Sequence, residues 1–286
     1  MAALLVTRPG PLTTVQDLGR FGVAHLGVPR AGALDQPAHR AANRLVGNAP
    51  TAATLETTLG GVTVRAQGGP LLLAVTGAPG GVRLDGRPAA WGAAVLVPAG
   101  ATLDVGPADF GVRSYLAVRG GIAVPAMLGS RSADLLAGLG PGPLRAGDLL
   151  PVGAEYGAPA AELVPLPAIP SELVLRLGPG PRADWFLPGT LAALARARYQ
   201  VAAASNRVAL RTEGPALIRS RHGELESEGM VLGAVQVPPD GRPVVFLADH
   251  PTTGGYPVIG VVPAPDLAAA AQAGPGTPVR FVPVRA

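Results

Sequence analysis

Short apolar runs that stop at glycine, proline or aspartate constrain the fold of this chain more than any other feature. Clear examples are GVTVRA at 61–66, PLLLAVTG at 70–77 and SYLAVRGGI at 114–122. Runs of this length between turn-forming residues predict β-strands. The same pattern recurs at residues 93–100, 102–106, 173–178, 208–214, 233–239, 243–249 and 278–284. We therefore expect a mainly β protein with a few short helices.

A small number of segments have helical features instead. Asp35 can cap one helix, because an aspartate oxygen accepts hydrogen bonds from the free N–H groups of a first turn. Residues 190–199 and 266–274 predict two more helices, with Thr190 and Asp266 as their caps.

Turn-forming residues also indicate how the chain is divided. Its 286 residues include 40 glycines and 32 prolines, a content that argues against a helical bundle. Asp-Gly pairs at 85–86 and 240–241 predict tight hairpin turns. Prolines recur at short intervals over residues 159–172, which predicts a semi-rigid linker. We therefore expect two β-rich halves, at 1–160 and 170–286.

Residue types that are missing exclude several classes of function. All 23 basic residues are arginine, so a Walker-type ATP site, which needs lysine, is excluded, as is a lysine that could carry biotin. The net charge is only +4 and no basic run exceeds two residues, which argues against nucleic-acid binding. Cysteine is absent and the histidines lack H-E-x-x-H spacing, so no metal site is predicted. We expect no signal peptide and no membrane span, and hence a cytoplasmic protein.

Polar residues gather in four glycine-rich stretches of a chain that is only 15% charged. Glycine lets backbone N–H groups approach a small polar ligand, so these stretches could hold a substrate. The substrate-binding candidates are Gln16, Arg20, His25, Asp35, Asn43, Glu56, Ser205, Asn206, Gln236, Thr252, Thr253 and Tyr256. The catalytic candidates are Asp17, Arg207 and Glu228.

These residue types suit a small planar substrate that carries a carboxylate or an amide. Asp17 or Glu228 could act as a general base, and Arg20 or Arg207 could bind a carboxylate or phosphate through two hydrogen bonds. A structural role is the alternative for each residue; Asp17, for example, could simply cap a turn. The functional assignment predicts that Asp17→Ala or Arg207→Ala abolishes activity while the melting temperature stays near wild type.

Longer motifs extend over nearly the whole chain in a fixed order. They include TTVQDLGR at 13–20, LETTLGG at 55–61, LGSRSADL at 128–135, SNRVALR at 205–211, SEGM at 227–230 and TTGGYP at 252–257. In these motifs the chain resembles the family that contains the C subunit of 5-oxoprolinase. That family is also called Kip antagonist, allophanate hydrolase subunit 2 or biotin-dependent carboxyltransferase C-terminal domain.

The resemblance implies a cyclophilin-like β-barrel architecture and a role in a complex of several subunits. The implied reaction is the ATP-dependent opening of 5-oxo-L-proline to L-glutamate. The implied partners are the other two subunits of 5-oxoprolinase. These are the Kip-inhibitor-like B subunit, which is often encoded next to this one, and the A subunit. ATP would then be a cofactor of the complex. One alternative is the carboxyltransferase half of a biotin-dependent urea or guanidine carboxylase. Another is a non-enzymatic Kip antagonist that binds a histidine-kinase inhibitor.

Overall fold

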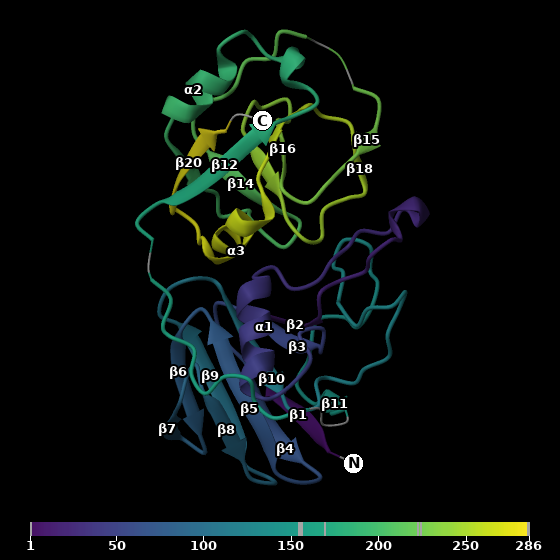
Figure 1. Ribbon diagram of the computed structural model, residues 1–286, viewed down its shortest axis with the longest axis vertical. Coiled ribbons are helices and arrows are strands. Elements are labelled where there is room, and N and C mark those ends of the chain that lie inside the picture. Colours follow the sequence, from purple (N-terminus) through teal and green to yellow (C-terminus); the bar gives the residue numbers. More distant parts are fainter. Residues whose placement is uncertain (1, 154–156, 169, 222, 224, 285–286) are drawn as a thin grey trace. The chain divides into compact units, whose positions relative to one another are not determined.

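The chain forms two compact units in the computed structural model, which describes residues 2–153, 157–168, 170–221, 223 and 225–284 (Figure 1). Unit 1 consists of Met1–Phe21 and Ala31–Ile169, and unit 2 consists of Gly22–Arg30 and Pro170–Ala286. Residues 22–30, close to the N-terminus, therefore belong to unit 2 by their contacts.

Unit 1 is built from two antiparallel sheets. The six-stranded sheet has the order β11-β1-β4-β9-β6-β7. Its strands are β1 (Ala3–Arg8), β4 (Thr63–Gln67), β6 (Gly80–Leu84), β7 (Arg87–Ala89), β9 (Thr102–Ala108) and β11 (Leu149–Pro151). The five-stranded sheet has the order β2-β3-β10-β5-β8. Its strands are β2 (Leu12–Gln16), β3 (Thr54–Thr58), β5 (Leu71–Gly77), β8 (Ala94–Val97) and β10 (Arg113–Val118).

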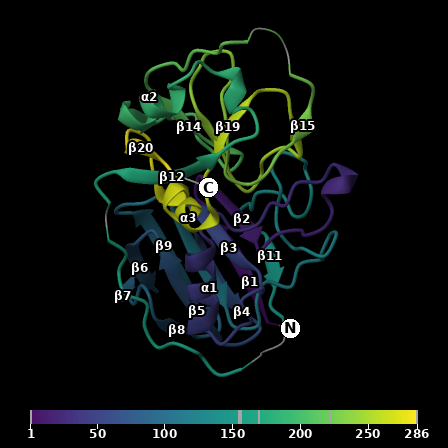
Figure 2. The same cartoon turned by 45° about the horizontal axis from the view of Figure 1, so that its top comes forward.

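The core of unit 1 contains apolar side chains from both sheets. Leu4 and Leu103 come from the six-stranded sheet, and Leu55, Leu73 and Leu116 come from the five-stranded sheet. A second apolar cluster packs α1 (Gln36–Leu45) against β5 and β10. Figure 2 shows α1 lying over the sheet that contains β5. β10 is buried at every residue because both of its faces are covered.

Unit 2 is a closed barrel with the strand order β12-β19-β16-β17-β14-β13-β20. The strands are β12 (Leu173–Pro179), β13 (Tyr199–Val201), β14 (Ala209–Glu213), β16 (Ala234–Gln236), β17 (Val244–Phe246), β19 (Val258–Val261) and β20 (Pro278–Pro283). β12 and β20 pair in parallel, and the other barrel pairs are antiparallel. A separate ribbon pairs β15 (Glu228–Gly229) with β18 (Thr253–Gly254).

Short helices complete unit 2. α2 (Thr190–Arg196) contacts β20, and α3 (Ala264–Gln272) contacts β12. Two single turns of 3-10 helix are η1 (Ala24–Leu26) and η2 (Ala183–Trp185). Among the described residues, no helix is both long enough and apolar enough to cross a membrane.

The predicted mainly β architecture is confirmed, and each of the predicted apolar runs contains a strand. The cap of the first helix is also confirmed, because an Asp35 carboxylate oxygen accepts the Ala38 N–H at 3.0 Å. The first Asp-Gly hairpin forms between β6 and β7, with Asp85 and Gly86 at φ +48° and +78°. These left-handed angles are those of the predicted tight turn.

Three local predictions were wrong. Gly189, not Thr190, caps α2, and Thr190 is the first helical residue. Asp266 lies inside the first turn of α3 and not at its cap, because its carboxylate pairs with Arg176 of β12. The pair at 240–241 lies in a longer connection between β16 and β17, where only Gly241 has a positive φ.

Candidate functional site

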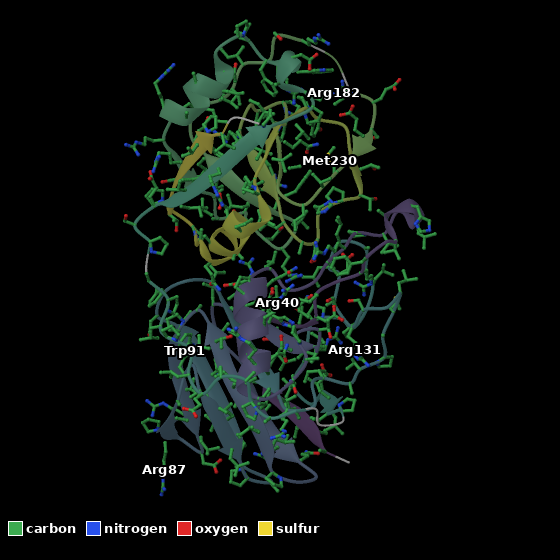
Figure 3. All side chains as sticks on the ribbon, viewed as in Figure 1. Arg40, Arg87, Trp91, Arg131, Arg182 and Met230 are labelled. Atoms are coloured by element: carbon green, nitrogen blue, oxygen red, sulfur yellow. The ribbon has the colours of Figure 1, made fainter. Side chains whose placement is uncertain are left out.

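Asp17 directly follows β2 and holds a distant segment in place. Its carboxylate accepts hydrogen bonds from the hydroxyls of Ser130 and Ser132, both at 2.6 Å. It also accepts the backbone N–H groups of Gly19 at 2.8 Å and Arg131 at 2.7 Å. Arg131, labelled in Figure 3, marks this segment. Because four donors already occupy this buried carboxylate, the contacts describe a positioning role for Asp17.

Gln16 and Arg20 flank Asp17 and contact the same segment. The Gln16 amide nitrogen donates to the carbonyl oxygen of Ala133 at 3.1 Å, and Arg20 Nη2 donates to that of Ser132 at 2.6 Å. Arg20 Nε donates to the Met127 carbonyl at 3.2 Å. Within the described part of the chain, Gln16 Oε1, Arg20 Nη1 and Asp134 Oδ2 are buried without a hydrogen-bond partner.

Glu56 and Asp35 are connected through a tyrosine in the same unit. The Asp35 N–H donates to the Tyr115 hydroxyl at 2.7 Å, and that hydroxyl donates to Glu56 Oε2 at 2.7 Å. Glu56 Oε2 also accepts the Leu34 N–H, and Arg113 Nε lies 3.7 Å from Oε1. Burial and the nearby negative charge of Glu56 raise the pKa of Tyr115 well above its usual value, so the hydroxyl stays protonated. This relay fixes the start of α1.

Asn43 holds the other end of α1. Its side-chain nitrogen donates to the Ala52 carbonyl at 2.9 Å, and its oxygen accepts from Asn48 at 2.9 Å. Asn48 in turn donates to the Val118 carbonyl and accepts the Gly120 N–H, both at 2.8 Å. Both polar atoms of the buried Asn43 side chain are therefore used in hydrogen bonds within unit 1.

His39 of α1 is buried. It is expected to make the stability of unit 1 fall at acidic pH. Burial, only partly offset by the Pro50 carbonyl and the charges of Asp17 and Glu56, lowers its pKa from 6.5 to about 4. The unfolded chain therefore binds a proton that the native chain excludes, so stability falls as the pH drops from about 6.5 to 4. The expected loss is roughly 3 kcal/mol, which urea unfolding at several pH values would measure.

The matched control for this prediction is His25, which is exposed on η1. His39→Gln should reduce the slope of stability against pH between 4 and 6.5, and His25→Gln should leave the slope unchanged. An unchanged slope in His39→Gln would rule out His39 as the source of the acid sensitivity.

Arg207 of unit 2 forms a buried, bidentate ion pair with Asp249. Its Nε and Nη2 atoms donate to the two carboxylate oxygens of Asp249, each at 2.9 Å. The side chains are 2% and 0% exposed. Asn206 and Ser205 shape the turn beside this pair: Asn206 accepts the Val208 N–H at 2.8 Å, and Ser205 accepts the Arg211 N–H at 3.0 Å.

Glu228 lies on the β15–β18 ribbon of unit 2 and pairs with Arg182, which is labelled in Figure 3. Both side chains are partly exposed. Thr253, directly across the ribbon from Gly229, is exposed, and the Thr252 hydroxyl donates to the Gly27 carbonyl at 3.3 Å.

Gln236 is buried beneath the ribbon and donates to the Tyr256 carbonyl at 3.1 Å. The Tyr256 ring is partly exposed, and the Arg219 guanidinium lies 5.7 Å from its centre. Gly254 packs closely over Gln236, since a Cβ at this position would lie 2.8 Å from the Gln236 amide nitrogen. Gln236 therefore positions the loop that carries Thr252, Thr253 and Tyr256.

Within each unit, the predicted site residues lie in more than one group. Gln16, Asp17 and Arg20 meet the segment at 127–134, and Asp35, Asn43 and Glu56 lie at the two ends of α1. The remaining candidates belong to unit 2. Sequence reasoning did not select Ser130, Ser132 or Asp134, although the motif LGSRSADL contains all of them. Across the described residues, no group of His, Cys, Asp or Glu is arranged to hold a metal ion.

The two-sheet unit and the closed barrel define a carboxyltransferase-type protein. The family description "Carboxyltransferase domain, subdomain A and B" matches residues 26–283, and the chain belongs to this family. It is 40% identical over 282 residues to the 5-oxoprolinase C subunit of Escherichia coli (strain K12), covering 98% of this chain and 90% of that protein. The predicted family resemblance is therefore confirmed.

Solved structures share the fold. The crystal structure of TTHA0988 has a TM-score of 0.89 and 40% identity over 99% of this chain, which spans 56% of that longer chain. The crystal structure of the Kluyveromyces lactis urea carboxylase has a TM-score of 0.91 and 30% identity; this chain spans 27% of it.

Proposed function

We propose that this chain is the C subunit of an ATP-dependent 5-oxoprolinase that opens 5-oxo-L-proline to L-glutamate. The observation that carries the proposal is the 40% identity to the Escherichia coli protein over 90% of that protein's length. The partners under this proposal are the B and A subunits of the same enzyme, and the complex works in the cytoplasm, where ATP is available.

The reaction adds water to a lactam carbonyl and breaks the ring C–N bond, so that the ring nitrogen becomes the amine of glutamate. An amide is a poor electrophile, and groups that polarise its carbonyl would favour the attack. The chain has no lysine and hence no Walker-type phosphate loop, so we assign ATP binding to the complex and not to such a loop in this chain.

Among the catalytic candidates, we retain Glu228 as the accessible carboxylate. Asp17 and Arg207 are buried in internal contacts, which supports positioning roles for both. Thr252, Thr253 and Tyr256 lie near Glu228 on the same ribbon and loop, which supports a role for this surface in ligand binding.

A second candidate function is the carboxyltransferase half of a biotin-dependent urea carboxylase. The fold match to the Kluyveromyces lactis urea carboxylase favours it. Because this chain has no lysine to which biotin could be attached, a separate carrier protein would have to supply carboxybiotin.

The test is to purify the chain with its B and A partners and to measure glutamate release from 5-oxoproline. We expect release that depends on ATP and on all of the subunits. A complex that lacks this chain is the control, and release at the same rate without it would overturn the proposal.

A further inference from the structure

Three buried polar atoms in unit 1 lack hydrogen-bond partners among the described residues. They are Gln16 Oε1, Arg20 Nη1 and Asp134 Oδ2, on residues that are 0%, 2% and 2% exposed. A buried polar group without a hydrogen-bond partner destabilises the fold, and a charged group does so more strongly. Other such atoms include Thr57 Oγ1 on β3 and Trp91 Nε1 between β7 and β8. Gln16 and Arg20 both contact the backbone directly before Asp134, so a ligand bound beside this backbone would supply the missing partners.

The backbone of residues 132–134 connects the three side chains. Arg20 Nη2 donates to the Ser132 carbonyl, and the Gln16 amide donates to the Ala133 carbonyl. Asp134 is the next residue, and its Oδ1 atom accepts the N–H groups of Leu136 at 3.0 Å and Ala137 at 2.9 Å. Each side chain is thus held by one or two of its polar atoms and has another left over.

The leftover atoms have the chemistry that an amide group requires. Arg20 offers a cationic N–H donor, and Gln16 and Asp134 each offer an acceptor. A lactam or a urea presents one carbonyl oxygen, which accepts, and at least one N–H, which donates. A guanidinium on the carbonyl oxygen would also stabilise the negative charge that develops there when the amide carbon is attacked.

The segment at 127–140 carries Asp134 and the backbone groups that Gln16 and Arg20 contact. It belongs to the long connection between β10 and β11, and its Met127, Leu128 and Leu136 side chains are exposed. Gly140 lies directly against the site, since a Cβ there would be 2.3 Å from the Ser132 carbonyl oxygen and 3.0 Å from Arg20 Nη2. Because the three atoms have almost no exposed surface, a ligand reaches them only when this segment moves aside.

We infer that Gln16, Arg20 and Asp134 bind the amide group of the substrate, and that the segment at 127–140 closes over it. The inference rests on the proposed function for its substrate class, a lactam or a urea-type amide. The carbonyl oxygen accepts from Arg20, and the single N–H of a lactam donates to Asp134. A urea has a further N–H group, which would donate to Gln16. Asp17, through Ser130 and Ser132, holds the covering segment in its closed position.

Binding of small amides to the purified full chain tests this inference. The probes are 2-pyrrolidinone, which has only the lactam group, and N-methyl-2-pyrrolidinone, which lacks the N–H. Wild type should bind 2-pyrrolidinone at least about tenfold more tightly than N-methyl-2-pyrrolidinone, because a hydrogen bond to a carboxylate contributes about 1.5–3 kcal/mol. Equal binding of the two probes, or no binding of 2-pyrrolidinone, would overturn the inference.

Asp134→Asn tests the ligand-binding role of Asp134 separately from its role in holding the loop. The asparagine oxygen can still accept from Leu136 and Ala137, but its nitrogen replaces the acceptor with a donor. We expect at least about tenfold weaker binding of 2-pyrrolidinone. Asp148→Asn is the matched control, because Asp148 also accepts a local backbone N–H, from Arg145 at 2.7 Å, and should bind the probe like wild type.

The outcomes distinguish this inference from the proposed function. If the complete complex releases glutamate but Asp134→Asn binds the probe like wild type, the site is wrong and the function stands. If the chain binds lactams in the predicted way but no glutamate is released, the site stands and the function is wrong.

Discussion

Replacing Arg207 with alanine is expected to destabilise unit 2 by about 3–5 kcal/mol, because the change leaves the fully buried carboxylate of Asp249 without its guanidinium partner. This reverses the expectation that the sequence alone supports, in which the variant loses activity and keeps its melting temperature. Scanning calorimetry and denaturant unfolding of the purified chain would measure the change.

Two further variants sharpen this prediction. Arg198→Ala removes an exposed partner of Glu172 and should cost less than about 1 kcal/mol, since surface ion pairs contribute little. The double variant Arg207→Met with Asp249→Leu should recover much of the lost stability, because it leaves no unpaired buried charge. An Arg207→Ala protein that melts like wild type and has lost only its activity would restore a direct catalytic role for Arg207.

Asp17→Ala is expected to have the second large effect, a loss of about 3 kcal/mol in unit 1. The variant removes a charged acceptor from two hydroxyls and two backbone N–H groups, and hydrogen bonds to charged groups contribute about 1.5–3 kcal/mol each, without being additive. Hydrogen exchange should become faster over residues 127–134, because this carboxylate holds that segment against the end of β2.

Asp109→Ala is the matched control, because Asp109 is an exposed aspartate of the same unit. It should leave both the stability and the exchange of residues 127–134 unchanged. If Asp17→Ala abolished glutamate release while the exchange of that segment stayed as in wild type, Asp17 would act on the substrate and not through the segment.

Local patterns were sufficient to predict many of the strands and the first helix, but not strands such as β1, β3 and β19. The run SYLAVRGGI predicted β10, and Asp35 caps α1 as its position before a proline-containing first turn suggested. These features depend on neighbours along the chain, so a single sequence contains the relevant information. Asp266 shows where this reasoning fails, because its partner, Arg176, is 90 residues away and displaces it from a capping role.

The roles of the site residues depend on similar long-range pairings. Asp17 meets Ser130 across 113 residues, and Arg207 meets Asp249 across 42. From the sequence, both looked like free polar groups in glycine-rich loops. In the folded chain, the charged group of each residue is bonded to buried partners. Asp134 is the converse case: it lies in the LGSRSADL motif but was not selected as a candidate, and it retains a buried carboxylate oxygen that has no partner among the described residues.

The most direct test of the central claim compares two reactions of one preparation. The chain, purified with its B and A partners, would be given ATP and either 5-oxo-L-proline, with glutamate measured, or urea, bicarbonate and an added biotin carboxylase with its carrier, with carboxylated urea measured. We predict that glutamate forms in proportion to the ATP hydrolysed and that urea is not carboxylated. Carboxylation of urea without any glutamate release would contradict the assignment and identify the chain as part of a carboxyltransferase.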